Sequence, residues 1–516
     1  MSNPNPPAPA ASKPLWPRWL GLIAFAGYLA FIGSHTAVVA GGSDSSGYLN
    51  SGRLLSQGKL LTDLRAPPAF GPRADLDPMH FLPQGFFPFT DRTQLTPTYP
   101  TGLPLHFALA GKLFGWSVGP WLIVLLAAAA VVWLTYSVAV VWLTYSVARA
   151  LDLSAPLAIA GATVIAAFPV FIFAAIQPLS DTLATAWTLA ALRCALFSRR
   201  SAHRAFAGAL ACGGALGLAV LVRPTNSLLA PALLILLGMN WRKLGLFALG
   251  GMPAALWLAF YNHQLYGGPF QSGYGEIFPA FALPYGAPTL AHFTHWLALL
   301  LPSVFLALPV FAWLRRDTRT RELLAVTLAF TAITSLYLFY EVSREVWWCL
   351  RFILPALPPL IFLGLIGIEA LARGPGARWP HPFRTGAAAL VGVWALALSG
   401  YWTPKLGVFL VQGYEQAYEQ GSLAAREKLP PNAVIMSFAF SGSLYYYTDF
   451  PVLRWDQMDA PIFSNYAASA HKSSVPVCAL LFDWEEKDAF TRCPGPWQRV
   501  ATLANIGLWT LPPPQT

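Results

Sequence analysis

Long runs of apolar residues alternate with short polar connections along almost the whole chain. With a window of about 20 residues for a membrane-crossing helix, this pattern predicts about eleven spans. They cover residues 19–40, 118–146, 156–176, 179–197, 205–222, 226–239, 243–262, 295–314, 323–341, 352–372 and 385–402. We therefore expect a mainly α-helical, polytopic membrane bundle.

The composition agrees with a protein embedded in lipid and excludes a soluble enzyme. Hydrophobic residues make up 56% of the 516 residues, charged residues make up only 11%, and the mean hydropathy is positive. Such a chain has more apolar surface than a water-soluble protein can expose. The formal net charge is +10, but no basic face is interleaved with aromatic residues, so we expect no nucleic-acid partner.

Lys and Arg are concentrated in alternate loops, and this asymmetry predicts the orientation of the chain. The stretch 263–294, between two predicted spans, contains neither Lys nor Arg. Because basic loops resist translocation, the basic set is predicted to be cytoplasmic. The N-terminus is then cytoplasmic, and an odd number of spans places the C-terminus outside. The basic set comprises Lys13, Arg18, Arg149, Arg199, Arg200, Arg204, Arg242, Lys243, Arg315, Arg316, Arg319, Arg321, Arg373, Arg378 and Arg384.

Two polar stretches are too long to be simple connectors, and function is expected to lie in them. We divide the chain into a disordered cytoplasmic tail (1–18), a transmembrane domain (19–402) that includes the outer loop 41–103, and an extracytoplasmic domain (403–516). Within the loop, 44–57 has the pattern of a short amphipathic helix. Residues 101–115 predict a second helix that lies on the outer membrane surface. A nine-residue sequence occurs at 131–139 and again at 140–148, so the second span is expected to be long and tilted.

The C-terminal stretch alternates short apolar runs with turns and predicts a small α/β domain. We expect helices near 422–429 and 441–447 and strands near 433–437, 475–482 and 499–510. Cys478 and Cys493 both lie in this exported part, where oxidation can occur, so a disulfide between them is predicted. The alternative is two reduced thiols in a small core. Cys194 and Cys212 lie in predicted helices and are interpreted as packing residues.

Two carboxylates lie at the outer ends of predicted spans. Asp44 follows the first span and is suited both to a helix N-cap and to a catalytic role. Apolar surroundings are expected to raise its pKa and to favour proton abstraction. Asp181 begins the fourth span and either caps that helix or contacts a substrate or metal. Asp44 and Asp181 are also the candidate ligands for a divalent cation, although no tight ligand cluster is visible. His292 and His295 are attributed to an interfacial helix.

Three arginines lie at the same predicted depth as these carboxylates. Each of Arg223, Arg344 and Arg351, taken alone, is explained by a long side chain reaching toward the interface. Together with the two aspartates they form a charged layer, while the predicted membrane interior contains almost no charge. A transporter is expected to carry ionisable groups near the midplane, so this distribution favours chemistry at the surface.

Four motifs, three of which contain Asp44, Arg223 or Arg351, together resemble those of a known family. The sequence contains Ser-Asp44-Ser-Ser-Gly-Tyr48-Leu, Tyr99-Pro-Thr-Gly, Arg223-Pro and Arg351-Phe-Ile-Leu-Pro. They resemble motifs of the GT-C membrane glycosyltransferases, in particular the branch of protein O-mannosyltransferases and lipid A aminoarabinose transferases. The resemblance covers residues 19–400. It departs from the mannosyltransferase pattern at Ser45, where those proteins have Glu, and this argues against carrying over a paired-carboxylate mechanism.

The resemblance implies an enzyme that transfers a hexose or pentose from a polyprenyl-phosphate carrier to an acceptor hydroxyl at the outer face of the inner (cell) membrane, with inversion. The acceptor is then a lipid, glycan or protein. The departing phosphate needs cations, for which Arg223, Arg344 and Arg351 are candidates. The hydroxyl needs a base, for which Asp44 is the candidate. Tyr48, Tyr99 and Asp181 are candidate substrate contacts. Tyr445, Tyr446 and Tyr447 either stack on a sugar or are divided between core and surface.

Two other functions fit a polytopic chain. The first is a flippase for lipid-linked sugars, or another transporter. The second is a structural or assembly component with a sensory outer domain. The long first outer loop and the scarcity of charge in the predicted membrane interior argue against the transporter.

Overall fold

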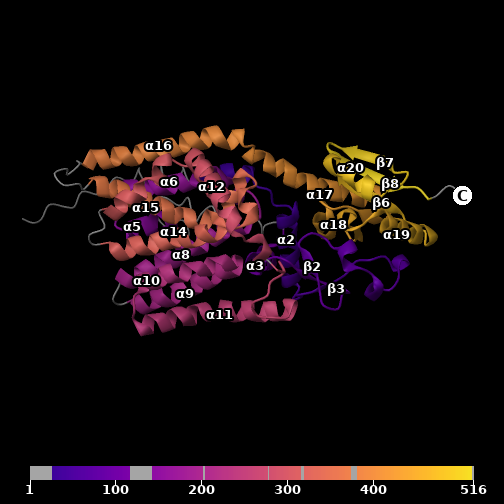
Figure 1. Ribbon diagram of the computed structural model, residues 1–516, viewed down its shortest axis with the longest axis horizontal. Coiled ribbons are helices and arrows are strands. Elements are labelled where there is room, and N and C mark those ends of the chain that lie inside the picture. Colours follow the sequence, from indigo (N-terminus) through magenta and orange to yellow (C-terminus); the bar gives the residue numbers. More distant parts are fainter. Residues whose placement is uncertain are drawn as a thin grey trace, which may run out of the picture.

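A computed structural model describes residues 26–513 apart from 29, 117–141, 201–203, 277, 315–318 and 373–380. The molecule is elongated (Figure 1). Long helices run side by side along its long axis, and the C-terminal sheet lies at one end together with the first polar loop. Helix α17 (Val411–Lys428) connects the bundle to this sheet.

Twelve described helices build the bundle, and several of them are short. They are α5 (Trp142–Ala150), α6 (Ala155–Ala166), α7 (Pro169–Ala175), α8 (Ser180–Arg200), α9 (Ala205–Val222), α10 (Ala230–Leu237), α11 (Trp241–Tyr266), α12 (Gly286–Leu300), α13 (Leu308–Leu314), α14 (Thr320–Leu338), α15 (Leu357–Ala372) and α16 (His381–Lys405). Short 3-10 helices extend or connect them at Pro224–Leu229, Phe278–Ala280, Leu283–Tyr285, Ser303–Leu306, Glu341–Arg344, Trp347–Ala356 and Val408–Leu410.

The expected eleven spans are not confirmed. Five described helical segments are long and apolar enough to cross a membrane, and α6 with α7 forms a sixth that is bent by 62°. The five are Ala205–Val222, Trp241–Tyr266, Thr320–Leu338, Trp347–Ala372 and Arg384–Lys405. The predicted span 19–40 is described only from residue 26, apart from 29, and is helical at 26–28 and 30–34. The predicted span 118–146 lies largely outside the described residues, as does the first copy of the internal repeat.

Proline accounts for much of the difference between the apolar runs and the observed helices. The run 156–176 breaks before Pro169, and the run 295–314 breaks at Pro302, between α12 and α13. The run 226–239 is divided between a 3-10 helix and α10, because Pro224 starts the first and Pro231 lies in the first turn of the second. Proline lacks an N–H and favours the first turn of a helix, so an apolar run containing it becomes two elements.

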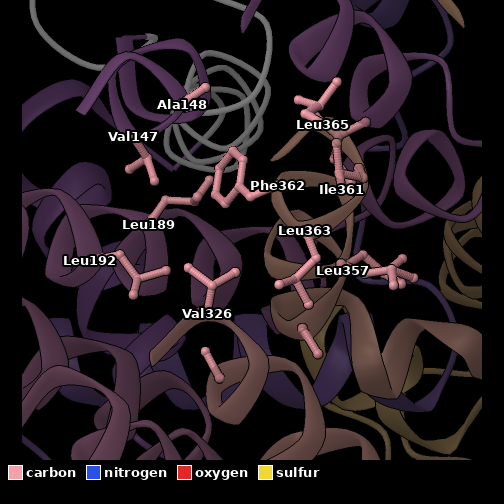
Figure 2. Packing of buried hydrophobic residues seen from close by; sticks show 14 of the residues in the cluster. Val147, Ala148, Leu189, Leu192, Val326, Leu357, Ile361, Phe362, Leu363 and Leu365 are labelled. Atoms are coloured by element: carbon pink, nitrogen blue, oxygen red, sulfur yellow. The ribbon is translucent and has the colours of Figure 1, made fainter. Parts of the chain in front are cut away.

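Helix α15 forms the centre of the bundle. Of the residues in its apolar window, 89% are buried, compared with 6% for α11 at the edge. Phe362 of α15 reaches toward Leu189 of α8 (Figure 2), and both side chains are fully buried. Helix α11 instead exposes large apolar side chains such as Leu256 and Phe260, as expected for a helix that contacts lipid.

Helices α9 and α11 approach each other closely along a face of small residues. A Cβ at Gly213 would meet the carbonyl oxygen of Phe247, and a Cβ at Gly250 would meet that of Leu210. Small residues allow helix backbones to approach each other where no hydrophobic effect drives association, as in lipid.

The first polar loop is ordered and begins with α2 (Ser43–Ser56), as the amphipathic pattern predicted. Three antiparallel strands follow, β1 (Thr62–Asp63), β2 (Phe86–Pro88) and β3 (Gln94–Pro97), in the order β1-β3-β2. Short 3-10 helices lie between β1 and β2 at Pro68–Phe70, Arg73–Asp75 and Pro78–Phe81. Helix α3 (Gly102–Phe114) packs against α2 and exposes Leu109, Leu113 and Phe114.

The C-terminal part is an α/β unit, as predicted, around a five-stranded sheet of order β5-β4-β6-β8-β7. Strands β5, β4 and β6 are parallel, whereas β6, β8 and β7 are antiparallel. The predicted strand 499–510 is a hairpin of two strands. The elements are β4 (Val434–Met436), α18 (Ser441–Tyr447), β5 (Val452–Leu453), a 3-10 helix (Trp455–Gln457), α19 (Ala460–Lys472), β6 (Val477–Phe482), α20 (Asp483–Arg492), β7 (Gln498–Leu503) and β8 (Ile506–Leu511).

The first loop and the C-terminal sheet share one hydrophobic core. A single buried cluster contains Leu64, Phe81 and Leu95 from the loop together with Met436 and Leu481 from the sheet. The loop, which the sequence analysis groups with the membrane domain, is therefore packed as part of the C-terminal unit. Helix α2 belongs to this loop, so its position depends on the C-terminal unit as well as on the helical bundle.

The predicted disulfide between Cys478 and Cys493 is not formed. Both cysteines are free and fully buried. Successive residues of β6 point to opposite faces of the sheet, so Cys478 packs in one cluster while Ala479 packs in the other, where Cys493 lies. The two thiols therefore lie on opposite faces of the sheet. The structure agrees with the alternative prediction, two reduced thiols in a small core.

Candidate active site

Asp44 lies in the first turn of α2, at the junction of the first loop and the helical bundle. Gly42, not Asp44, is the N-cap residue, so the carboxylate of Asp44 is not used to cap the helix backbone. The positive end of the helix dipole favours an anion at this position.

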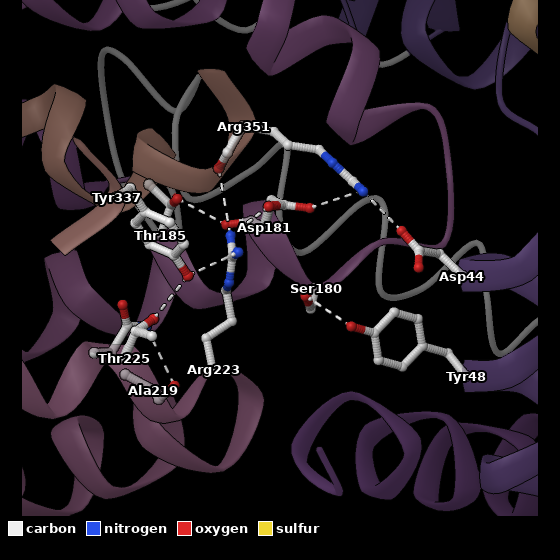
Figure 3. Close-up of polar contacts among 11 residues, drawn as sticks. Asp44, Tyr48, Ser180, Asp181, Thr185, Ala219, Arg223, Thr225, Tyr337 and Arg351 are labelled. Carbon is white, nitrogen blue, oxygen red and sulfur yellow. Dashed lines mark hydrogen bonds and ion pairs between the residues drawn. The ribbon is translucent and has the colours of Figure 1, made fainter. Parts of the chain in front are cut away.

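Four charged side chains form a continuous chain of alternating sign (Figure 3), which we call the charge chain. Arg351 donates to Asp44 through its NH2 group, 2.9 Å from Oδ2, and its NH1 group lies 3.7 Å from Oδ2 of Asp181. Arg223 donates through NH1 to Oδ1 of Asp181. The order is therefore Asp44, Arg351, Asp181, Arg223.

The charge chain is assembled from segments far apart in sequence. Asp181 lies in the first turn of α8, Arg223 directly follows α9, and Arg351 lies in the 3-10 helix Trp347–Ala356. The backbone is extended at Arg223 (φ −144°, ψ 108°) because Pro224 follows, which disfavours a helical conformation for the residue before it. The NH2 group of Arg223 also donates to the hydroxyl of Tyr337, over 3.2 Å.

Asp44 is the most exposed member of the charge chain, and Asp181 is the most buried. The side chain of Asp44 is 32% exposed, whereas those of Arg351, Asp181 and Arg223 are 14%, 3% and 13% exposed. Asp44 is thus the member that an incoming molecule meets. The other three members are two cations and one anion, so the charge of Asp44 is needed to balance them.

The pKa of Asp44 is lowered, contrary to the sequence-based expectation. Burial alone would raise this pKa, but the Arg351 guanidinium outweighs burial, with smaller contributions from the hydroxyl of Tyr99 and from Arg223. The expectation considered only the apolar surroundings and missed the cation. Asp44 is therefore held ionised by its partner.

Tyr48 and Tyr99, the candidate substrate contacts, lie beside Asp44. Their rings lie 4.6 Å apart. The hydroxyl of Tyr48 donates to Oγ of Ser180 over 3.0 Å, and the hydroxyl of Tyr99 lies 3.0 Å from Oγ of Ser43. Burial, together with the charge of Asp44, raises the pKa of both phenols, so both stay neutral and serve as hydrogen-bond donors.

Arg344 is not part of the charge chain. Its guanidinium lies over the ring of Tyr285, 4.6 Å from the ring centroid, and the ion pairs of the described residues do not include it. The depth argument placed Arg344 in the same layer, but depth does not specify the direction in which a side chain points. We expected Arg344 to bind the donor phosphate. Its guanidinium makes no ion pair with Asp44 or Asp181 that would support this role.

Glu415 of α17 is a carboxylate that sequence reasoning missed. Its Oε2 accepts a hydrogen bond from the backbone N–H of Gly42, over 3.3 Å, just before Asp44. Burial raises the pKa of Glu415, a hydrogen bond from Ser45 opposes that rise, and the nearby Asp44 adds to it. The predicted helix 422–429 starts too late to include Glu415, so extending it toward the bundle would have revealed an acid beside the first loop.

Neither aspartate is arranged as a metal ligand. Both Asp44 and Asp181 are bound by guanidinium groups, and Arg351 lies between them where a shared cation would have to be. Within the described ranges, three or more His, Cys, Asp or Glu side chains do not gather at any one point. His292 instead contacts the backbone oxygen of Val346, 3.2 Å away.

Solved structures of the same architecture are known, although no protein-family model and no curated protein sequence matches the chain. ArnT from Cupriavidus metallidurans bound to undecaprenyl phosphate matches with a TM-score of 0.56 at 14% identity, over 96% of this chain and 98% of that one. The Archaeoglobus fulgidus oligosaccharyltransferase tethered to an acceptor peptide matches with a TM-score of 0.53 at 12% identity, over 93% and 71%. These neighbours are GT-C membrane glycosyltransferases. The chain has the GT-C fold.

A third neighbour extends the GT-C comparison. The arabinofuranosyltransferase AftD from Mycobacteria matches with a TM-score of 0.53 at 15% identity, over 96% of this chain but only 40% of that one. The GT-C fold and the apolar helices together identify a multi-pass membrane protein. At these identities the comparison establishes the fold, and the chemistry has to be argued from the charge chain.

Proposed function

We propose that the protein is a membrane glycosyltransferase that moves a sugar from a polyprenyl-phosphate carrier to an acceptor hydroxyl. The observation that supports this best is the charge chain, in which one partly exposed carboxylate is coupled to two buried guanidinium groups. The GT-C neighbours support it as well, because one is described as bound to undecaprenyl phosphate and another as tethered to an acceptor peptide.

The phosphate of the donor binds at Arg351 in this proposal. The Nε atom of Arg351 is buried and has no hydrogen-bond partner among the described residues, so one donor of its planar group remains free. Guanidinium groups bind phosphate oxygens through paired donors, and a fixed cation stabilises the charge that develops as the phosphate departs. Arg223 and Asp181 hold Arg351 in place from its buried side.

Apolar side chains beside Arg351 suit the lipid part of the donor. Trp348 stacks against Phe173, with 5.8 Å between their ring centroids, and the guanidinium of Arg351 lies 5.3 Å from the Trp348 ring. The first isoprene units would lie on this aromatic surface while the phosphate reaches the cation.

Asp44 acts as the general base. In the free protein Arg351 stabilises the negative charge of Asp44, so Asp44 has a low proton affinity and is a weak base. When the donor phosphate competes for Arg351, Asp44 loses part of that stabilisation and its proton affinity rises. It then takes the proton of the acceptor hydroxyl as that oxygen attacks the anomeric carbon, and the C–O bond to the phosphate breaks. Attack from the face opposite the phosphate gives inversion.

Tyr48 and Tyr99 keep the proposed role of substrate contacts, whereas Asp181 takes another role. Each of the two neutral phenols beside Asp44 would exchange its present partner, Ser180 for Tyr48 and Ser43 for Tyr99, for a sugar oxygen. Asp181 is too buried to meet a sugar, so it acts by orienting Arg351 and Arg223.

Membranes from cells that produce the protein provide the test. They would be supplied with polyprenyl-phosphate sugars, and transfer would be followed as release of polyprenyl phosphate. We expect turnover by the wild type and a loss of about 100-fold or more in Asp44→Asn, the range for a general base. Asp75→Asn, an exposed acid of the same loop, is the matched control. Equal turnover in Asp44→Asn would remove Asp44 from this role, and movement of intact donor across the bilayer would indicate a flippase.

We also propose that the charge chain lies on the extracytoplasmic side of the inner membrane, with the N-terminus cytoplasmic. The distribution of Lys and Arg supports this orientation. Single cysteines at Asp75 and Arg242, introduced into a cysteine-free background, should react differently with a membrane-impermeant maleimide in whole cells. Labelling is expected at 75 and not at 242, and the reverse result would refute the orientation.

A further inference from the structure

A basic cavity lies beside the C-terminal half of α2, between the first loop and α18. Its volume is about 580 Å³. Four cationic side chains line it, Arg53, Lys59, Arg65 and Arg426, and we call this cavity the basic pocket.

The cations of the basic pocket are largely uncompensated. Its lining contains a single acidic residue, Asp449, which is fully exposed and lies 3.8 Å from Arg65. Lys59 is exposed, and no ion pair of the described residues includes it. Four cations against one carboxylate leave three positive charges in a concave surface, where the field of like charges is focused.

A structural role explains only part of this arrangement. Arg53 donates to the backbone oxygen of Tyr446 (2.9 Å), and Arg65 donates to those of Tyr445 (3.2 Å) and Thr448 (2.7 Å). Arg426 donates to the backbone oxygen of Tyr447 over a longer distance, 3.4 Å. These bonds satisfy carbonyl groups at the C-terminal end of α18, a position that favours cations. Neutral donors would satisfy the same carbonyls, so capping does not account for the accumulated charge, and Lys59 caps nothing there.

Aromatic and hydroxyl groups complete the lining. Tyr445, Tyr446 and Tyr447 all face the basic pocket. Arg65 lies 3.8 Å from the centroid of the Tyr445 ring, and Arg53 lies 5.2 Å from that of Tyr446. Phenol rings suit the apolar faces of sugar rings, while guanidinium groups bind carboxylates and phosphates.

The basic pocket and Asp44 share one rigid element. Asp44 lies in the first turn of α2, and Arg53 lies nine residues later on the same helix, about 14 Å away along its axis. Tyr447 joins the two regions, since it lines the pocket while its hydroxyl accepts a hydrogen bond from the backbone N–H of Ala40 (2.9 Å). A short oligosaccharide is long enough to reach from one to the other.

We propose that the basic pocket binds the acceptor and that the acceptor is an anionic glycan, bearing carboxylate or phosphate groups. This inference rests on the proposed transferase function for its role, but the binding site can be tested without it. The anionic groups bind the cations of the pocket, and the hydroxyl to be glycosylated lies toward Asp44.

Binding of defined oligosaccharides to the purified full-length protein tests the proposal. The probes are trigalacturonate, a phosphorylated maltotriose and neutral maltotriose, each measured by calorimetry at low and high salt. At least one anionic probe should bind about tenfold or more tightly than maltotriose, and less tightly as salt rises. The anionic probe that binds more tightly identifies the acidic group.

The double variant Lys59→Gln/Arg426→Gln is the decisive comparison. It removes two charges and the bond from Arg426 to the backbone oxygen of Tyr447, but it leaves the Arg53 and Arg65 bonds to α18 in place. An unchanged melting temperature verifies that it folds. It should bind the anionic probe at least about tenfold more weakly than the wild type. Arg73→Gln, on the same loop but outside the pocket, should bind as the wild type does.

Three results would overturn the proposal. They are equal binding of charged and neutral probes, unchanged binding in the double variant, and binding only to vesicles of phosphatidylglycerol. Failure of the transferase itself would look different, because Asp44→Asn and wild type would then be equally inactive while the charge-dependent binding persisted. If the protein is a transferase but the basic pocket does not bind the acceptor, the double variant and the wild type would transfer sugar to neutral acceptors equally well.

Discussion

Replacing Asp181 with asparagine removes the negative charge at the centre of the charge chain and preserves the shape of the side chain. Asp181 is 3% exposed and contacts two arginines, which are themselves 13% and 14% exposed. The asparagine side chain would keep one neutral oxygen for Arg223 and would turn its NH2 group toward Arg351. Two buried cations would then face each other without the anion that separates them.

The expected loss in the free energy of unfolding follows from the burial of Asp181. Removal of one partner from a buried ion pair costs about 3–5 kcal/mol, because a buried charge remains unpaired. Asparagine retains part of the hydrogen bonding, so we expect about 3 kcal/mol of lost stability for Asp181→Asn. Asp44 is bound by the same Arg351 but is 32% exposed, so water replaces the lost partner. Arg351 also keeps Asp181 as a partner, so Asp44→Asn should cost less than about 1 kcal/mol, far less than Asp181→Asn.

The two variants separate stability from catalysis. Thermal unfolding of the purified proteins in lipid nanodiscs should show a fall of several degrees for Asp181→Asn and almost no change for Asp44→Asn. The transfer assay should show the larger loss per folded molecule for Asp44→Asn. Asp75→Asn serves as the control in both measurements. If Asp181→Asn melted with the wild type while Asp44→Asn melted lower, the burial argument would be wrong.

Three further outcomes are expected. First, because Arg351 holds the pKa of Asp44 below its usual range, Asp44 stays ionised and kcat/KM should fall only at a pH below the ordinary carboxyl value. If donor phosphate takes over Arg351, the corresponding limb of kcat should lie at higher pH; coincident limbs would show that the pair persists in the complex. Second, reductant should leave the melting temperature unchanged, since Cys478 and Cys493 are not bonded, and burial raises the pKa of Cys493 to about 12. Rapid alkylation of Cys493 at pH 8 would contradict this burial. Third, Gly213→Val should force α9 away from α11 and cost about 1–3 kcal/mol in thermal unfolding, whereas unchanged melting would show that the helices can separate freely.

Local patterns in the sequence predicted several elements well. Helix α2 was expected at 44–57 and is observed at Ser43–Ser56, and α18 was expected and observed at 441–447. Both helices are short and have polar residues at their ends. Neighbouring residues in the sequence therefore define where each helix begins and ends. The bundle was harder to predict, because hydrophobicity shows that a segment lies in lipid or core but not that proline divides it.

The candidate site was predictable in part. Helix ends in one layer bring charged residues to the same depth, and this reasoning placed Asp44, Asp181, Arg223 and Arg351 together. The pKa of Asp44 and the separate position of Arg344 depend on which side chains point at each other, which no linear pattern contains. The thiols of Cys478 and Cys493 show the same limit. Strand β6 is buried on both faces, so its alternation does not reveal which way Cys478 points.

The core shared by the first loop and the C-terminal sheet has a consequence for biosynthesis. Asp44 is made early, but the partners that hold its helix include Gly442 of α18, which accepts a hydrogen bond from Asn50, and residues as late as Leu511 in the cluster that packs the loop. The loop therefore remains incompletely packed until β8 has been translated, after the segments that form the bundle. A chain without β8 would lack part of this core, so α2 and the carboxylate of Asp44 would be held less firmly at the junction with the bundle.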